Sequence, residues 1–108
     1  MTTQQAKTKF ATLKRHRVMC AEGYAFAEGK SLEDAWATCQ VGQFMAWWLH
    51  EAAGVDLEAL RKLKIRTAPD LPVGTLTWSD WGYFEKLRWA EILRKHYTML
   101  GTKRKVRA

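Results

Sequence analysis

Apolar residues recur along most of this chain at intervals of three and four positions, the spacing that places them on one face of an α-helix. The first such stretch predicts a helix over residues 7–28, and Gly29 is the kind of residue that commonly ends a helix. The apolar positions of this stretch are Phe10, Leu13, Cys20, Tyr24 and Ala27. Residues 1–6 have no periodic apolar pattern, so we expect a flexible N-terminus.

A second, short helix is predicted to begin after Ser31, whose hydroxyl can cap it, with Asp34 three residues on in a capping-box-like arrangement. Its apolar face consists of Leu32, Ala35, Trp36 and Cys39. Residues 43–53 are apolar on nearly every side, which is typical of a helix surrounded by other elements or by a partner. This third helix is the predicted centre of the core.

Two further signals predict a fourth helix of about two turns. Gly54 is expected to end the third helix and Asp56 to cap the next one. The inner face of this fourth helix consists of Leu57, Leu60 and Leu63. The segment 65–78 holds two prolines and a glycine and is therefore predicted to be a loop.

The sequence leaves one alternative open for this loop, a short pair of β-strands at residues 64–67 and 75–78.

The last helix is predicted to begin with Ser79 as its cap, because a hydroxyl side chain there can accept a backbone hydrogen bond. It is predicted to reach Leu100 before Gly101. The apolar face of this helix is Trp81, Phe84, Leu87, Ile92 and Leu93.

Together these elements predict an all-α fold, a compact bundle of four to five helices. The 108 residues are enough for one core, and 47% of them are hydrophobic, so disorder over the whole length is not expected. We expect a flexible N-terminus at 1–6, a single helical domain over 7–101 and a basic tail at 102–108.

The charges are sorted into blocks along the chain, which has a net charge of +7. Residues 1–17 hold five cations and no acid, whereas residues 18–60 hold seven acids against one lysine. Two shorter basic runs follow at 61–66 and 103–107. A small protein with basic segments at both ends is more often equipped for binding than for catalysis.

Candidate chemistry is sparse. His16, Cys20, Cys39 and His50 make a nominal set of zinc ligands, but only the first pair has the close spacing of a structural site. Neither cysteine has the electropositive setting and oriented base that a nucleophile needs. We therefore expect no metal, no cofactor and no catalytic residue, and interpret the chain as a protein that is not an enzyme.

Localisation follows from what the chain lacks. No apolar run approaches the roughly 20 residues that a membrane span requires, and the polar N-terminus does not resemble a signal peptide. We expect a cytoplasmic protein without membrane association.

Tryptophan is unusually frequent, with six in the chain. Trp and Arg are enriched among the residues that dominate protein interfaces. The neighbours Trp47 and Trp48 project about 100° apart on a helix, so one of them is a candidate for exposure. The candidate partner-binding residues are Trp47, Trp48, Arg88 and Trp89. The apolar helix at 43–53 would also suit a homodimer interface.

The basic segments suggest a second interpretation, direct binding of DNA or RNA, provided that the segments converge on one face. No helix-turn-helix, zinc-finger or RNA-recognition signature accompanies them. The candidate contact residues, for nucleic acid or for an acidic partner, are Lys14, Arg15, Arg17, Arg61, Lys62, Lys64, Arg66, Lys103, Arg104, Lys105 and Arg107.

The central third of the chain resembles a pattern in small bacteriophage-encoded helical proteins. It begins at Cys20-x-Glu22, continues through the Gly29–Cys39 string GKSLEDAWATC and ends with Gly42-x-FMAWWL. The chain departs from the pattern at Gln43 and Phe44, where an acid and a tryptophan are usual. The resemblance covers residues 20–54 and implies a phage or mobile-element origin, without an activity.

We therefore expect a phage-encoded accessory protein in the cytoplasm of a bacterial host. It would bind and modulate a host protein or nucleoprotein complex, such as a defence or regulatory factor. Direct DNA or RNA binding is the alternative, with the basic N-terminal helix, the 61–66 cluster and the tail as contacts.

Overall fold

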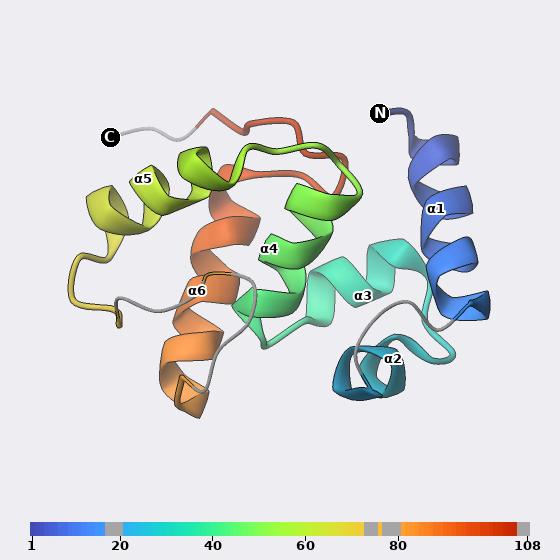
Figure 1. Cartoon of the computed structure of the whole chain (residues 1–108), viewed down its shortest axis with the longest axis horizontal. Helices are drawn as coiled ribbons and strands as arrows, with labels where there is room; N and C mark the ends of the chain where they lie inside the picture. The colour runs from blue at the N-terminus through green and yellow to red at the C-terminus, as the bar shows by residue number, and fades with distance from the viewer. Residues whose placement is uncertain (17–20, 73–75, 77–80, 106–108) are drawn as a thin grey trace.

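The computed structural model of the chain describes residues 1–16, 21–72, 76 and 81–105. This part of the chain forms six α-helices and no β-strand (Figure 1). They are α1 (Thr3–Arg15), α2 (Ala21–Ala27), α3 (Leu32–Thr38), α4 (Gly42–Glu51), α5 (Leu57–Thr67) and α6 (Tyr83–His96). The predicted all-α class is confirmed, with one helix more than the upper end of the predicted range.

The extra helix arises at the N-terminus, where the prediction of one helix over 7–28 is wrong. Two helices with different axes occupy this stretch, α1 and α2 (Figure 1). The start of α1 at Thr3 also lies four residues earlier than predicted, because a capping box stabilises it. The hydroxyl of Thr2 accepts a hydrogen bond from the Gln5 backbone N–H at 3.1 Å, and the Gln5 side chain accepts one from the Thr2 N–H at 2.8 Å. A search for apolar periodicity does not detect such a polar signal.

The predicted helix boundaries in the centre of the chain are confirmed. The Ser31 hydroxyl accepts a hydrogen bond from the Asp34 backbone N–H at 3.1 Å and begins α3, and the Asp56 carboxylate accepts one from the Glu58 N–H at 3.0 Å and begins α5. Gly29 and Gly54 both have a φ of +76°, the left-handed conformation that follows a helix end.

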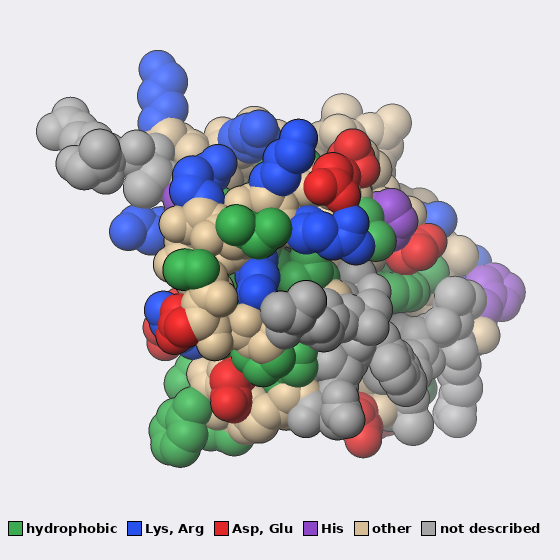
Figure 2. Space-filling view, turned by 60° about the vertical axis from the view of Figure 1, so that its left-hand side comes forward, with side chains coloured by type: hydrophobic (Ala, Val, Ile, Leu, Met, Phe, Trp, Pro, Cys, Tyr) green, Lys and Arg blue, Asp and Glu red, His purple; other side chains and the backbone are tan. Residues whose placement is uncertain are grey.

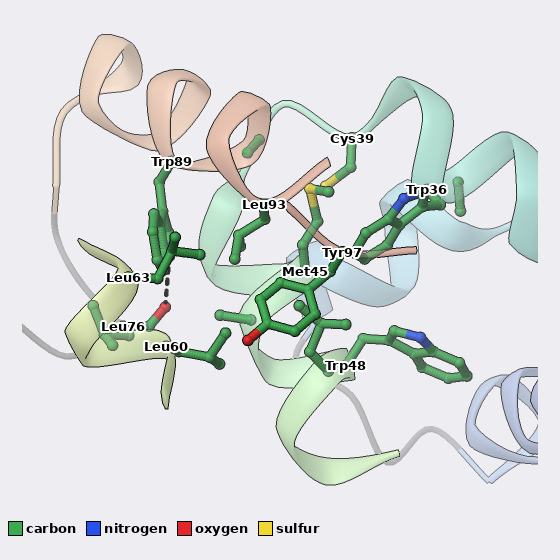
Figure 3. Close-up of a cluster of buried hydrophobic side chains, with 14 of the residues drawn as sticks. Trp36, Cys39, Met45, Trp48, Leu60, Leu63, Leu76, Trp89, Leu93 and Tyr97 are labelled. Carbon is green, nitrogen blue, oxygen red and sulfur yellow. Dashed lines mark hydrogen bonds between the residues drawn. The ribbon is translucent and has the colours of Figure 1, made fainter. Parts of the chain in front are cut away.

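The contact between α4 and α6 forms the centre of the core. Gly42, the first residue of α4, lies against the ring of Trp89 on α6; a Cβ at Gly42 would lie only 2.5 Å from a ring carbon. The indole N–H of Trp89 donates a hydrogen bond to the Leu76 carbonyl at 3.4 Å (Figure 3). Glycine at this position therefore makes room for a complete indole between the two helices.

The helix α5 is longer than predicted and corrects the expected loop boundary. It runs to Thr67, so residues 64–67 are its last turn and not a strand. Ala68, which precedes Pro69, leaves the helical conformation with a φ of −149°, as the residue before proline commonly does. The predicted partner strand at 75–78 lies mostly outside the described residues.

The last helix is shorter than predicted at both ends. Gly82 occupies the N-cap position of α6, and the predicted cap Ser79 lies outside the described residues. The helix ends at His96, not at Leu100. The chain then reverses at Gly101, which has a φ of +80°.

The basic tail predicted at 102–108 is not separate from the helical domain over the part that the structure describes, residues 102–105. After the reversal at Gly101, an isolated antiparallel bridge joins Tyr97 to Lys103. The Thr98 N–H donates to the Thr102 carbonyl and the Arg104 N–H to the His96 carbonyl, both at 2.9 Å. These residues therefore fold back along the end of α6.

Candidate nucleic-acid interface

Two basic segments that are far apart in the sequence lie side by side at one end of the molecule, namely α5 and the folded-back residues 103–105 (Figure 1). Burial lowers the pKa of His96 and raises the pKa of Tyr97, and the charge of Arg66, near the end of α5, acts on both groups in the lowering direction. The His96 carbonyl accepts a hydrogen bond from the Arg104 N–H, and Tyr97 forms a β-bridge with Lys103. The influence of Arg66 on these two residues therefore indicates that α5 lies close to the C-terminal segment. We call the exposed cations of these two segments the α5-tail surface: Arg61, Lys62, Arg66, Lys103, Arg104 and Lys105.

The cations of the α5-tail surface are carried by ordered backbone. On α5, Leu60 and Leu63 are buried while Arg61 and Lys62 are exposed, so the amphipathic pattern of the helix turns its charges outward. On the C-terminal side, the Arg104 guanidinium Nε donates to the Tyr97 carbonyl at 3.3 Å. The charges of the two segments therefore share a fixed scaffold.

The turn that reverses the C-terminal segment is itself anchored to α4. The Trp48 indole N–H donates a hydrogen bond to the Met99 carbonyl at 2.8 Å. A Cβ on Gly101 would lie 2.8 Å from the Cβ of Ala53, so the turn packs closely against the end of α4. These contacts set where the cations of residues 103–105 emerge.

Acidic neighbours neutralise only a part of this surface. Arg61 pairs with Glu58 on the same helix at 2.6 Å, and this pair is solvent-exposed on both sides. Among the described residues, no carboxylate lies within ion-pair distance of Lys62, Arg66, Lys103 or Lys105. Figure 2 shows the Lys and Arg side chains gathered over this end of the molecule.

The pKa of His96 is affected by the same positive charges. Burial lowers its pKa below the ordinary value of 6.5, and the charges of Arg66 and Lys95 lower it further. The imidazole is therefore predominantly neutral at pH 7, since protonating it would add another charge to a basic neighbourhood. The sequence alone offers no signal that His96 belongs to this region.

The other predicted cations lie elsewhere. Lys14 and Arg15 belong to α1, at the opposite end of the molecule from α5 (Figure 1). The condition that all basic segments converge on one face is therefore not met for these two residues. The Lys14 ammonium donates to the Lys30 carbonyl at 2.9 Å and lies 4.6 Å from the centre of the Phe10 ring. The predicted contact residues Arg17 and Arg107 lie outside the described residues.

Lys64 departs from its prediction in another way. With 5% of its surface exposed, it is buried on the inner side of α5. It therefore does not belong to the α5-tail surface, although its charge contributes to the lowered pKa of Asp70, which Arg88 chiefly causes.

The predicted tryptophan anchors are mostly internal. Trp89 has no exposed surface and Trp48 is buried (Figure 3). Trp47 is half-buried and packs against the core. The prediction of Trp48 and Trp89 as surface contacts is therefore wrong for this fold. Arg88 is exposed and forms an ion pair with Asp70 at 2.5 Å.

Two aromatic residues that the sequence did not mark as contacts are exposed. Phe84, predicted to lie on the inner face of the last helix, is 79% exposed, and its neighbour Tyr83 is 57% exposed. Both belong to the first turn of α6, and at about 100° per residue Phe84 lies on the opposite side of this helix from the buried Leu93.

The candidate metal ligands do not come together in the described part of the chain. No cluster of three or more His, Cys, Asp or Glu residues there could hold a metal ion. The Cys39 thiol is buried, which raises its pKa, and it donates a hydrogen bond to the Val41 carbonyl at 3.3 Å. Of the other nominal zinc ligands, His50 hydrogen-bonds to the Val55 carbonyl and Cys20 lies outside the description.

No family model matches the chain, and no curated protein and no solved structure is significantly similar to it. The resemblance to small bacteriophage proteins therefore stays a prediction. None of the described helices is both long and apolar enough to cross a lipid bilayer.

Proposed function

We propose that this protein binds nucleic acid directly, through the α5-tail surface. The observation that carries the proposal is the juxtaposition of α5 with residues 103–105. It brings onto one end of the molecule four cations, Lys62, Arg66, Lys103 and Lys105, whose side chains have neither an ion-pair nor a hydrogen-bond partner among the described residues. A polynucleotide offers a regular array of phosphates, to which Lys and Arg side chains bind with release of counterions.

This proposal takes the second of the two functions that the sequence predicts. The first, binding of a host protein, relied on exposed tryptophans, and two of the three candidates are buried. The cations of the α5-tail surface are exposed and lie on folded backbone, which supports direct binding of nucleic acid. A phage origin and a role in a bacterial host remain part of the proposal.

Contacts by α5 and the C-terminal segment would be made mainly to the phosphate backbone, because long cationic side chains dominate this surface. Such binding is sensitive to salt and only weakly dependent on sequence. If the four free cations each contact one phosphate, the logarithm of the affinity for duplex DNA should fall with the logarithm of salt concentration with a slope of about −4.

The test is a titration of fluorescently labelled duplex DNA, followed by anisotropy at two salt concentrations. The double variant Lys62→Gln/Lys103→Gln should bind more weakly and reduce the steepness of the salt slope by about 2. The matched control is Lys9→Gln/Arg15→Gln, which removes two exposed charges of α1 and leaves the α5-tail surface intact.

Binding that the control variant weakens as much as the test variant would contradict the proposal, because net charge alone would then explain it. Absence of binding to duplex and single-stranded DNA at low salt would also overturn it. So would an equal affinity for polyglutamate, since the surface would then recognise any polyanion.

A further inference from the structure

The first turn of α6 presents an aromatic pair that the fold does not use. The rings of Tyr83 and Phe84 meet edge to face, with centroids 5.4 Å apart and an angle of 79° between their planes. The Tyr83 hydroxyl donates to the Gln40 side-chain carbonyl at 3.3 Å, which orients its ring. Phe84, at 79% exposed, is the most exposed of the large hydrophobic residues described.

Arg88 lies between the aromatic pair and the segment that follows α5. Phe84 and Arg88 are four residues apart on α6, so they share a helix face and lie about 6 Å apart along its axis. Arg88 pairs with Asp70, which follows α5 in the chain. Figure 2 shows apolar side chains at the lower end of the same face whose upper end carries the gathered cations.

This combination of features fits one kind of polymer. A polymer that binds the α5-tail surface and continues past Arg88 to Phe84 would need negative charges where it meets the cations and a flat apolar group where it meets Phe84. A single-stranded nucleic acid has both, because its bases are free to stack on aromatic side chains while its phosphates contact cations. In a duplex the bases are already stacked on one another, and an acidic peptide offers a flat group only where it has an aromatic side chain, whereas a single strand offers one at every nucleotide.

We infer that the preferred ligand is single-stranded nucleic acid, with its phosphates on the α5-tail surface and an unstacked base on the exposed face of Phe84. This inference rests on the proposed function and goes further by naming the form of the nucleic acid. Tyr83 supports the Phe84 ring from the side, and Arg88 contacts the backbone between base and basic surface.

The test compares two labelled probes by fluorescence anisotropy, an oligothymidylate of about 15 nucleotides, near the upper end of common site sizes, and a hairpin duplex. Wild-type protein should bind the oligothymidylate more tightly. Phe84→Leu, which keeps an apolar side chain but removes the ring, should weaken that binding by about 5- to 100-fold and leave duplex binding unchanged. Phe84→Trp keeps a stacking surface and should retain the affinity.

Ile65→Ala is the matched control, because Ile65 is also an exposed apolar residue, 58% exposed, but has no ring. It should leave the affinity for the oligothymidylate nearly unchanged. Thermal unfolding of each variant checks the fold, and the exposure of Phe84 predicts that its replacement leaves the stability almost unaltered.

The outcomes separate the two proposals. If Lys62→Gln/Lys103→Gln weakens binding of both probes but Phe84→Leu changes neither, the stacking inference is wrong and the proposed function stands. The inference is also overturned if Phe84→Leu weakens both probes equally or if the duplex binds more tightly than the single strand. If wild-type protein binds neither probe, the proposed function itself fails.

Discussion

The two ends of this molecule are both basic, but their cations have different surroundings. At the α1 end, Lys7 forms an ion pair with Glu33 at 3.1 Å, and Lys14 is held by the Lys30 carbonyl beside the Phe10 ring. At the other end, the α5-tail surface presents several cations outward from a helix and a folded-back segment. The comparison teaches that the cations of a basic run can either form contacts within the fold or be exposed to solvent. Tertiary contacts decide between these two roles.

The largest effect is expected from Trp48, because this side chain contacts both ends. Its ring meets Phe10 of α1 edge to face at 5.9 Å, and its indole N–H binds the Met99 carbonyl. Trp48→Ala should lower the free energy of unfolding by about 3–5 kcal/mol, as measured by urea denaturation. Trp48→Phe keeps a ring against Phe10 and should lose about 1 kcal/mol. A loss for the half-buried Trp47→Ala as large as that for Trp48→Ala would contradict this account.

The next largest effect concerns Arg94, which fastens α6 to the end of α3. One guanidinium nitrogen donates to the carbonyls of Trp36 at 3.0 Å and Cys39 at 2.6 Å. Arg94→Met preserves the length of the side chain but leaves these carbonyls unpaired, so it should cost about 1–3 kcal/mol of stability in urea denaturation. The exposed Arg88→Gln is the control and should change stability little; a similar loss for both variants would refute the role given to Arg94.

A substitution at Gln43 should change the free energy of unfolding by a smaller amount and in the opposite direction. Its side chain is 3% exposed, and within the described residues neither its amide nitrogen nor its carbonyl oxygen has a hydrogen-bond partner. Gln43→Met should therefore raise the free energy of unfolding by about 1 kcal/mol, because an unpaired amide no longer has to be buried. Gln40→Met, at an exposed position, is the control. A fall in stability for Gln43→Met would indicate that the amide contributes to the fold after all.

The smallest effect tests the positive field at the α5-tail end through pH. Because the folded protein holds the pKa of His96 below 6.5, the unfolded chain takes up this proton more readily. The contribution of His96 to stability should be fully present above pH 6.5, decrease as the pH falls from about 6.5 to the lowered pKa, and level off below it. His96→Gln should reduce that decrease in urea denaturations at a series of pH values. An unchanged pH profile for His96→Gln would contradict the assignment.

Local signals made the central helices predictable. The caps at Ser31 and Asp56 act through hydrogen bonds within three residues, and the φ of +76° at Gly29 and Gly54 suits a residue without a side chain, so no distant contact is needed. The first helix was misjudged because its start depends on a polar capping box and because one apolar stripe spans two helices.

The site could be predicted only in part, because it depends on contacts between distant segments. The basic runs at 61–66 and 103–107 are visible in the sequence, but nothing in either run shows that they become neighbours. The burial of Trp89 depends on the space at Gly42, 47 positions earlier in the numbering. The exposure of Phe84 depends on which side of α6 packs against the core, and the buried side is that of Trp89, Ala90 and Leu93.

The folded-back C-terminal segment has a practical consequence for anyone who handles the protein. Lys105 belongs to the α5-tail surface and is three residues from the last residue, Ala108. A polyhistidine tag or fluorophore joined to the chain shortly after Lys105 would be tethered to this surface and disturb its electrostatics. Labels placed ahead of Met1 would start at the α1 end instead (Figure 1), provided that Thr2 keeps its capping role.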